Sequence, residues 1–202
     1  MVTSQEVRER YGARAGEYTA LLGSVDDLAE QDRELIARWA ESIGGSAIDA
    51  GCGPGHWTRF LHDRGVEVVG IDLVPEFVDI AARRFPDLDF RTGELGSLPV
   101  EDASLGGLLS WYSIIHTEPH AVPAVLDEFA RCLRPGATLL LGFVDGERLE
   151  PFDHAVVTAY RWPTREMERT LVASGFDVVE THARHDAGSR PHAAILARRR
   201  AA

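Results

Sequence analysis

The chain has 202 residues, 45% of them apolar, which suits one α/β domain with a sizeable core. Its 32 acidic and 21 basic residues give a net charge of −11, and because this charge repels phosphate backbones, nucleic acid is a poor candidate partner. The sequence holds no apolar run of about 18 residues, no apolar leader and no metal-like cysteine spacing, so we expect a reduced cytoplasmic protein without membrane contact or bound metal.

Taken in chain order, residues 4–22 predict a helix or helix pair, and residues 26–43 predict a further helix with acids at its start. From there on, strands alternate with helices. The expected strands cover residues 46–50, 66–71, 88–91, 105–112, 137–143, 176–182 and 191–198. The expected helices between them cover residues 56–64, 75–85, 120–133 and 164–174, the last capped by Thr164.

This alternation predicts a Rossmann-like α/β fold, a three-layer sandwich with a mostly parallel seven-stranded sheet covered by helices on both faces. The last two strands follow each other without a helix, so we expect an antiparallel hairpin at one sheet edge. Residues 145–163 show no clear period and predict an irregular segment. We expect residues 1–202 to form a single domain.

The stretch from Ala47 to Gly55 is the strongest signal of a binding site. An apolar run leads into Asp49, and glycines then stand at positions 51, 53 and 55, as expected where a buried strand ends in a turn that approaches a ligand closely. A second strand ends at Asp72, about 20 residues on, where an acid can hold the hydroxyls of a ribose. Together these features indicate a nucleoside-containing cofactor.

Four segments resemble the class I S-adenosylmethionine (SAM)-dependent methyltransferases of the small-molecule type, and the resemblance covers essentially the whole chain. In order, they are residues 48–55, 69–72, 92–99 and 128–136. The resemblance implies SAM as cofactor and S-adenosylhomocysteine as product. The residues favour the same cofactor over NAD, because the third glycine comes one residue too early for G-x-G-x-x-G and SAM carries no phosphate that needs a helix N-terminus.

The resemblance implies a role for each cofactor-binding residue. The backbone at Gly51 and Gly53 lies along the methionine part, while Asp49 acts on its ammonium end. Two further positions join this set, Leu73 after the second strand and Ser110 in the fourth.

The resemblance implies that three further residues bind the nucleoside end of the cofactor. The two carboxylate oxygens of Asp72 accept from the ribose hydroxyls. Glu94 accepts from the adenine amine, and the Leu95 N–H group contacts a ring nitrogen. Asp72 as a helix-capping acid and Glu94 as an exposed loop acid remain the alternative interpretations.

The N-terminal segment also resembles the family, through its Y-x-x-x-A-x-x-Y pattern from Tyr11 to Tyr18. The resemblance implies that residues 1–43 form a helical lid that ligand orders, with Tyr18 near the sulfonium, where an aromatic ring stabilises positive charge. In the alternative interpretation both tyrosines simply dock the helix. Residues 145–163 would form an acceptor-side insertion.

The methyl acceptor should lie beyond the fourth strand, at residues 110–116. This run lacks the Asn/Asp-Pro-Pro-aromatic pattern of nucleic-acid and glutamine methylases, and no acid pair marks a magnesium site. A hydroxyl acceptor benefits from a general base, for which His116 is the first candidate, His154 the second and Tyr112 the third. Each has an ordinary structural alternative, such as capping a helix or packing in a loop.

The sequence therefore predicts an enzyme that transfers the methyl group of SAM to an oxygen or nitrogen of a small organic metabolite. Two rivals stay open: a protein of the same fold that binds SAM or its product without methyl transfer, for example for a cyclisation, and an NAD(P)-dependent oxidoreductase. The sequence does not indicate the acceptor or the oligomeric state.

Overall fold

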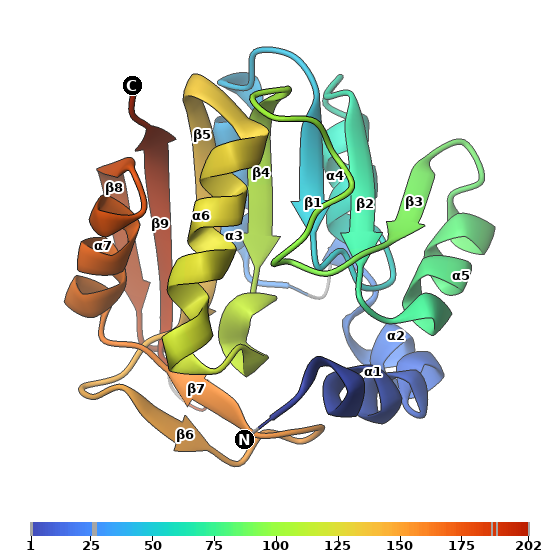
Figure 1. Cartoon of the computed structure of the whole chain (residues 1–202). Helices are drawn as coiled ribbons and strands as arrows, with labels where there is room; N and C mark the ends of the chain where they lie inside the picture. The colour runs from blue at the N-terminus through green and yellow to red at the C-terminus, as the bar shows by residue number, and fades with distance from the viewer. Residues whose placement is uncertain (1, 26–27, 187, 189, 202) are drawn as a thin grey trace.

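The computed structural model describes residues 2–25, 28–186, 188 and 190–201. Its centre is a seven-stranded sheet with the order β3-β2-β1-β4-β5-β9-β8, in which β9 runs antiparallel to both β5 and β8 while the other neighbours are parallel (Figure 1). The strands are β1 (Ala47–Ala50), β2 (Val68–Asp72), β3 (Asp89–Thr92), β4 (Leu105–Trp111), β5 (Leu133–Val144), β8 (Phe176–Arg184) and β9 (His192–Arg199). This confirms the predicted fold class, including the antiparallel edge.

Helices cover both faces of the sheet (Figure 1). One face carries α3 (Glu30–Glu41) and α4 (His56–His62), the other carries α6 (Val122–Cys132) and α7 (Thr164–Ala173), and α5 (Pro75–Arg84) packs on β2 and β3. Pro75 occupies the first turn of α5, as expected for a residue whose φ suits a helix start.

The apolar stripes of these helices explain the layers. On α6, for example, the buried residues recur at intervals of three and four, which places them on one side of the helix. They are Val122, Val125, Leu126, Phe129 and Cys132. Strand β4 between the layers is buried at all of its seven positions, as a central strand with both faces covered should be.

Helix and strand boundaries differ from the predictions by up to four residues, and three elements illustrate this. The helix expected over residues 26–43 begins at Glu30 and ends at Glu41, with residues 26 and 27 outside the described part of the chain. The helix expected from residue 120 begins at Val122, after the short helix η3 (Pro119–Ala121). Strand β5 begins at Leu133 rather than at residue 137, because the chain is already extended there and Leu133 pairs with Leu105 of β4.

Two further expectations, on residues 145–163 and on Thr164, were wrong. The segment contains a hairpin of β6 (Glu150–Phe152) and β7 (Ala159–Arg161). Thr164 is the first residue of α7 and not its N-cap, which is Pro163. Asp145 explains the difference: its Oδ1 accepts hydrogen bonds from the Thr164 N–H group and hydroxyl at 3.2 and 2.9 Å, so a distant carboxylate satisfies the helix start.

The carboxyl ends of the parallel strands meet at one edge of the sheet. Helices α1 (Ser4–Gly12) and α2 (Ala15–Leu22) and the β6–β7 hairpin lie along this edge (Figure 1). The Thr3 hydroxyl accepts from the Glu6 N–H group at 3.2 Å and so caps α1. Among the described residues, no helix combines the length and apolar character that crossing a membrane requires.

Candidate active site

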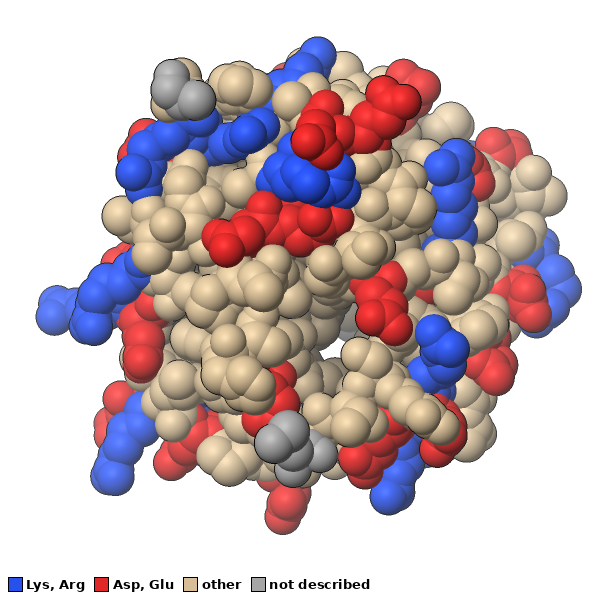
Figure 2. Space-filling view, in the orientation of Figure 1, with Lys and Arg blue, Asp and Glu red and all other residues tan. Residues whose placement is uncertain are grey.

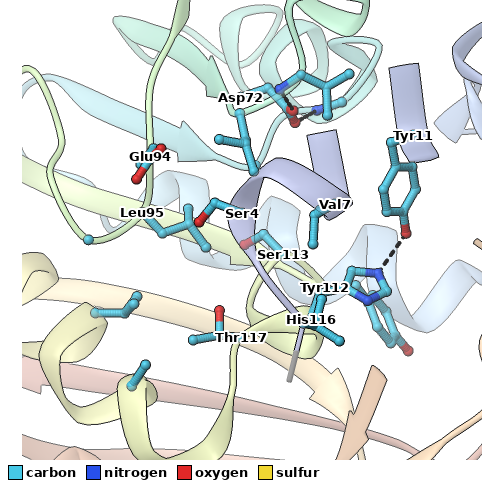
Figure 3. Close-up of a pocket in the computed structure, with 18 of the residues that line it drawn as sticks. Ser4, Val7, Tyr11, Asp72, Glu94, Leu95, Tyr112, Ser113, His116 and Thr117 are labelled. Atoms are coloured by element: carbon cyan, nitrogen blue, oxygen red, sulfur yellow. Dashed lines mark hydrogen bonds between the residues drawn. The ribbon is translucent and has the colours of Figure 1, made fainter. Parts of the chain in front are cut away.

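A cavity of about 480 Å³ lies at this edge, within the range of about 300–1,000 Å³ that small-molecule sites occupy. Its wall comes from the glycine turn after β1, the end of β2, the loop after β3, the segment after β4 and the start of the chain (Figure 3). On the face of the molecule drawn in Figure 2, the hollow is bordered mainly by residues without charge, and the nearest described charged side chains are acidic.

The glycine turn forms the floor of the cavity. Gly51 and Gly53 have φ angles of 86° and 52°, which favour glycine. A Cβ at position 51 would lie 2.2 Å from Cβ of Ser113, whereas a Cβ at position 53 would meet nothing within 4 Å. Gly51 thus lets the segment after β4 come close to the turn, and Gly53 leaves its backbone open to the cavity.

Asp72 at the end of β2 is held in place by the backbone. Its Oδ2 accepts from the Gly53 N–H group at 2.7 Å, and its Oδ1 accepts from the Val74 N–H group at 2.8 Å (Figure 3). The second contact satisfies the start of α5, so the capping interpretation describes part of what this side chain does. Each oxygen keeps a further acceptor site for a ligand. Burial raises the pKa of the carboxyl to about 6.

Glu94 and Leu95 line the cavity from the loop after β3 (Figure 3). Arg131 of α6 braces the rest of this loop, since its guanidinium donates to the carbonyl oxygens of Leu98 and Val100 at 3.2 and 2.9 Å. Leu73, Tyr18 and the two glycines are in the same wall. The structure therefore brings together most of the residues predicted to bind cofactor.

Two of the predicted cofactor residues do not line the cavity. Asp49 is buried behind the turn, where its Oδ2 accepts from the Thr58 hydroxyl at 2.8 Å, and burial raises its pKa to about 7. Ser110 is buried in β4, and its hydroxyl is 2.6 Å from that of Ser113, which is in the wall. Ser110 thus supports a wall residue from behind, whereas Asp49 ties the end of β1 to Thr58 of α4.

His116 does line the cavity, and its two ring nitrogens have different partners. The Thr158 carbonyl, 2.9 Å from Nδ1, can only accept, so Nδ1 carries the proton. Nε2 is then an acceptor, and the hydroxyl of Tyr11 donates to it at 2.8 Å (Figure 3). Burial lowers the pKa of the ring, which is therefore neutral near pH 7.

The other two base candidates differ from each other in position. Tyr112 is in the wall, with a φ of 58° that is uncommon for a residue other than glycine, and its hydroxyl is bonded to Nδ1 of His192. His154 does not line the cavity. Its ring centroid lies 5.0 Å from that of His116, and burial lowers its pKa to about 4.

Sequence reasoning missed two groups of wall residues. The extended N-terminal segment shows no motif, yet it crosses the cavity, and the Val2 N–H group donates to Oε1 of Glu118 at 2.6 Å. The residues around the short helices after β4 carry no periodic signal either. The missed wall residues of these two groups include Val2, Thr3, Ser4, Val7, Thr117, Glu118 and His120, and Phe77 of α5 was missed as well.

These observations fit an adenosyl cofactor without phosphates. The cavity offers carboxylates for ribose and adenine hydrogen bonds and an open glycine backbone, and no arginine is in its wall among the described residues. The part of the chain that the structure describes contains no group of three or more His, Cys, Asp or Glu side chains placed to hold a metal ion.

Comparisons with known proteins agree with this geometry. Residues 47–136 match the family described as "Methyltransferase domain". The malonyl-[acyl-carrier protein] O-methyltransferase of Serratia marcescens is 28% identical over 154 residues, which are 76% of this chain and 58% of the relative. The chain thus spans little more than half the length of that relative.

Two solved structures share the fold over nearly the whole chain. The [4+2]-cyclase SpnF has a TM-score of 0.83 at 19% identity, covering 99% of this chain and 98% of its own. The second is the 1,6-didemethyltoxoflavin-N1-methyltransferase of Burkholderia thailandensis, solved with bound 1,6-didemethyltoxoflavin and S-adenosylhomocysteine. Its TM-score is 0.81 at 19% identity, and the match covers 98% of this chain and 88% of the other. The domain match, the curated relatives and the cavity together support a class I SAM-dependent methyltransferase, with S-adenosylmethionine as cofactor.

Proposed function

We propose that this protein transfers the methyl group of SAM to an oxygen or nitrogen atom of a small organic molecule. The observation that carries the proposal is one cavity whose wall holds both the cofactor residues at the ends of β1, β2 and β3 and a polar pair, Tyr11 and His116, with a neutral imidazole. Bound SAM supplies an electrophilic methyl group, and the electron pair of the broken carbon–sulfur bond leaves with the sulfur.

The chain's own residues bind and orient the cofactor, and they exclude water from it. Asp72 and Glu94 would accept from the ribose hydroxyls and the adenine amine, while the backbone of Gly51 and Gly53 would lie along the methionine part. Tyr18 would face the sulfonium. Asp49 and Ser110 act from behind the wall, where Asp49 holds Thr58 and Ser110 holds Ser113. This proximity and orientation supply a large part of a methyl-transfer rate.

We further propose that residues 1–43 act as a lid and that residues 145–163 border the acceptor. Three contacts support the lid: Val2 bonds to Glu118, Tyr11 bonds to His116, and Arg8 donates to the Leu73 carbonyl at 3.2 Å. Each joins the N-terminal segment to the cavity wall. In this proposal a single, cytoplasmic domain acts on a metabolite and on no nucleic acid, in keeping with the charge of −11.

A function without methyl transfer is the second candidate. Its support is the likeness to SpnF, which is named a cyclase and has the same fold. The relatives named as methyltransferases act on a carrier-protein-bound malonyl group and on a toxoflavin precursor, so the fold alone does not fix the acceptor. The domain match leaves the NAD(P) alternative without support.

The test is incubation of the whole chain with methyl-labelled SAM and a panel of small phenols, carboxylic acids and amines. The proposal predicts a labelled product from at least one class and stoichiometric S-adenosylhomocysteine. Labelled SAM that binds and stays intact with every member would favour the second candidate.

A further inference from the structure

The hydrogen bonds around His116 give this residue and Tyr11 different positions. The imidazole can receive a proton but is enclosed by protein groups, whereas Tyr11 can contact a methyl acceptor in the cavity. Nδ1 is occupied by the Thr158 carbonyl, and Nε2 is occupied by the Tyr11 hydroxyl (Figure 3). Both nitrogens are therefore used within the protein, and His116 is 8% exposed. A substrate cannot hydrogen-bond directly to this imidazole while Tyr11 stays in place.

Tyr11 has an oxygen that is still available. A phenol oxygen donates one hydrogen bond and accepts others, and here the donor proton is committed to His116. No other hydrogen bond to the Tyr11 oxygen is found among the described residues, and the side chain lines the cavity. A proton-bearing group in the cavity can thus donate to this oxygen.

Packing fixes the Tyr11 ring in this position. Its ring centroid lies 5.7 Å from that of Tyr18 and 5.9 Å from that of Phe77. Burial raises the pKa of the Tyr11 hydroxyl, so the hydroxyl stays protonated and donates to His116. His116 is fixed from the other side by Thr158, next to the β6–β7 hairpin. The pair therefore exists only when α1 and the hairpin are both docked on the cavity.

We propose that Tyr11 and His116 form a proton relay in which Tyr11 contacts the methyl acceptor and His116 receives the proton. This deepens the proposed function and rests on it. The acceptor's O–H or N–H bond breaks as its lone pair forms the bond to the methyl carbon. Its proton passes to the Tyr11 oxygen while the Tyr11 proton passes to Nε2 of His116, leaving a neutral tyrosine, an imidazolium and S-adenosylhomocysteine.

The relay also predicts the class of acceptor. A proton relay is useful to a neutral hydroxyl or amine, because its oxygen or nitrogen gains positive charge as it binds the methyl group and becomes neutral again by losing a proton. It offers nothing to an acceptor already ionised without a proton, such as a carboxylate. The site therefore selects a neutral hydroxyl or an amine over a carboxylate such as a malonyl group.

The first test examines the tautomer of His116 in the whole chain saturated with S-adenosylhomocysteine, labelled with ¹⁵N-histidine and studied by NMR near pH 7. The relay predicts a protonated Nδ1 and an unprotonated, hydrogen-bonded Nε2. Tyr11→Phe, which keeps the ring, should move the Nε2 signal toward its unbonded value, whereas Tyr160→Phe on β7 should not. A proton on Nε2, or a signal that Tyr11→Phe leaves in place, would overturn the relay.

The second test measures methyl transfer to the same phenol, amine and carboxylic acid panel. Tyr11→Phe should lower the turnover of phenols or amines by about 10²-fold or more, the usual size of a general-base contribution, while S-adenosylhomocysteine affinity changes less than about threefold. Equal turnover by Tyr11→Phe and the unaltered chain, or turnover of carboxylic acids alone, would refute the relay and leave the proposed function standing. Absence of turnover with the predicted tautomer intact would instead refute the proposed function.

Discussion

The hydroxyl of Tyr112 is hydrogen-bonded to Nδ1 of His192, 80 positions away in the chain. Nε2 of the same ring lies 3.7 Å from Oδ1 of Asp32 on α3, and this carboxylate favours a proton on Nε2, so Tyr112 is the donor to Nδ1. Arg184 of β8 holds Asp32 through two contacts of 2.5 and 3.2 Å. This network of polar contacts thus links the cavity wall to α3 and the antiparallel edge of the sheet.

The first prediction concerns how much this network of polar contacts contributes to the stability of the protein. Asp32→Ala should lower the free energy of unfolding by about 2–3 kcal/mol, because it leaves the buried His192 without its carboxylate neighbour and Arg184 with Asp186 alone. Chemical denaturation measures the loss. Asp186→Ala is the matched control, since Asp186 also pairs with Arg184 but is half exposed, and should cost no more than about 1 kcal/mol. Equal losses for both variants would contradict the account.

The second prediction separates the two glycines of the turn. Gly51→Ala should cost about 2–5 kcal/mol of stability, since its φ is 86° and its Cβ would collide with Ser113. Gly53→Ala should cost only about 1–2 kcal/mol, because its Cβ meets open space, yet it should weaken S-adenosylhomocysteine binding by filling part of the cavity. Denaturation and calorimetry on both variants check this, and an unaltered affinity for Gly53→Ala would argue against a cofactor on the turn.

The third prediction is a pH dependence of cofactor binding. The pKa of Asp72 is raised to about 6 by burial, so at pH 5 only about a tenth of the carboxyl groups are ionised. S-adenosylhomocysteine should therefore bind about tenfold more weakly at pH 5 than at pH 7.5. Asp72→Asn should bind weakly at both pH values with a flatter profile, whereas Asp79→Asn, exposed on α5, should keep the profile. An unchanged slope in Asp72→Asn would assign the effect to another group.

The fourth prediction concerns Asp49, whose pKa is raised to about 7 by burial. A raised carboxyl pKa means that the folded state binds more protons than the unfolded state between about pH 4 and 7, so the contribution of Asp49 to stability falls as the pH rises through this window. Asp49→Asn removes that loss. The free energy of unfolding of the variant minus that of the unaltered chain should rise by about 2–3 kcal/mol from pH 5 to pH 8. A pH-independent difference would show that Asp49 titrates normally.

The sequence predicted the sheet and the cofactor half of the site because those features are local. The glycine turn, Asp72 and the Glu94-Leu95 pair each follow a strand whose apolar run is readable, and the carboxyl ends of parallel strands meet at one edge. Asp49 shares the motif, but its place behind the wall depends on its bond to Thr58, which no spacing reveals.

The missed features are non-local or too short to carry a pattern. The bonds from Tyr11 to His116 and from Tyr112 to His192 join positions 105 and 80 apart, and only tertiary packing brings them together. Strands β6 and β7 have three residues each, too few for an alternation of apolar and polar positions. Thr164 has the residue type of an N-cap, but Asp145 takes over the capping contact.

Calorimetric titration of the whole chain with S-adenosylhomocysteine, and in parallel with NAD, tests the central claim most directly. The account predicts saturable binding of one S-adenosylhomocysteine per chain, weakened by Asp72→Ala, and no binding of NAD. Heat from NAD alone, or an Asp72→Ala variant that binds S-adenosylhomocysteine as tightly as the unaltered chain, would contradict it.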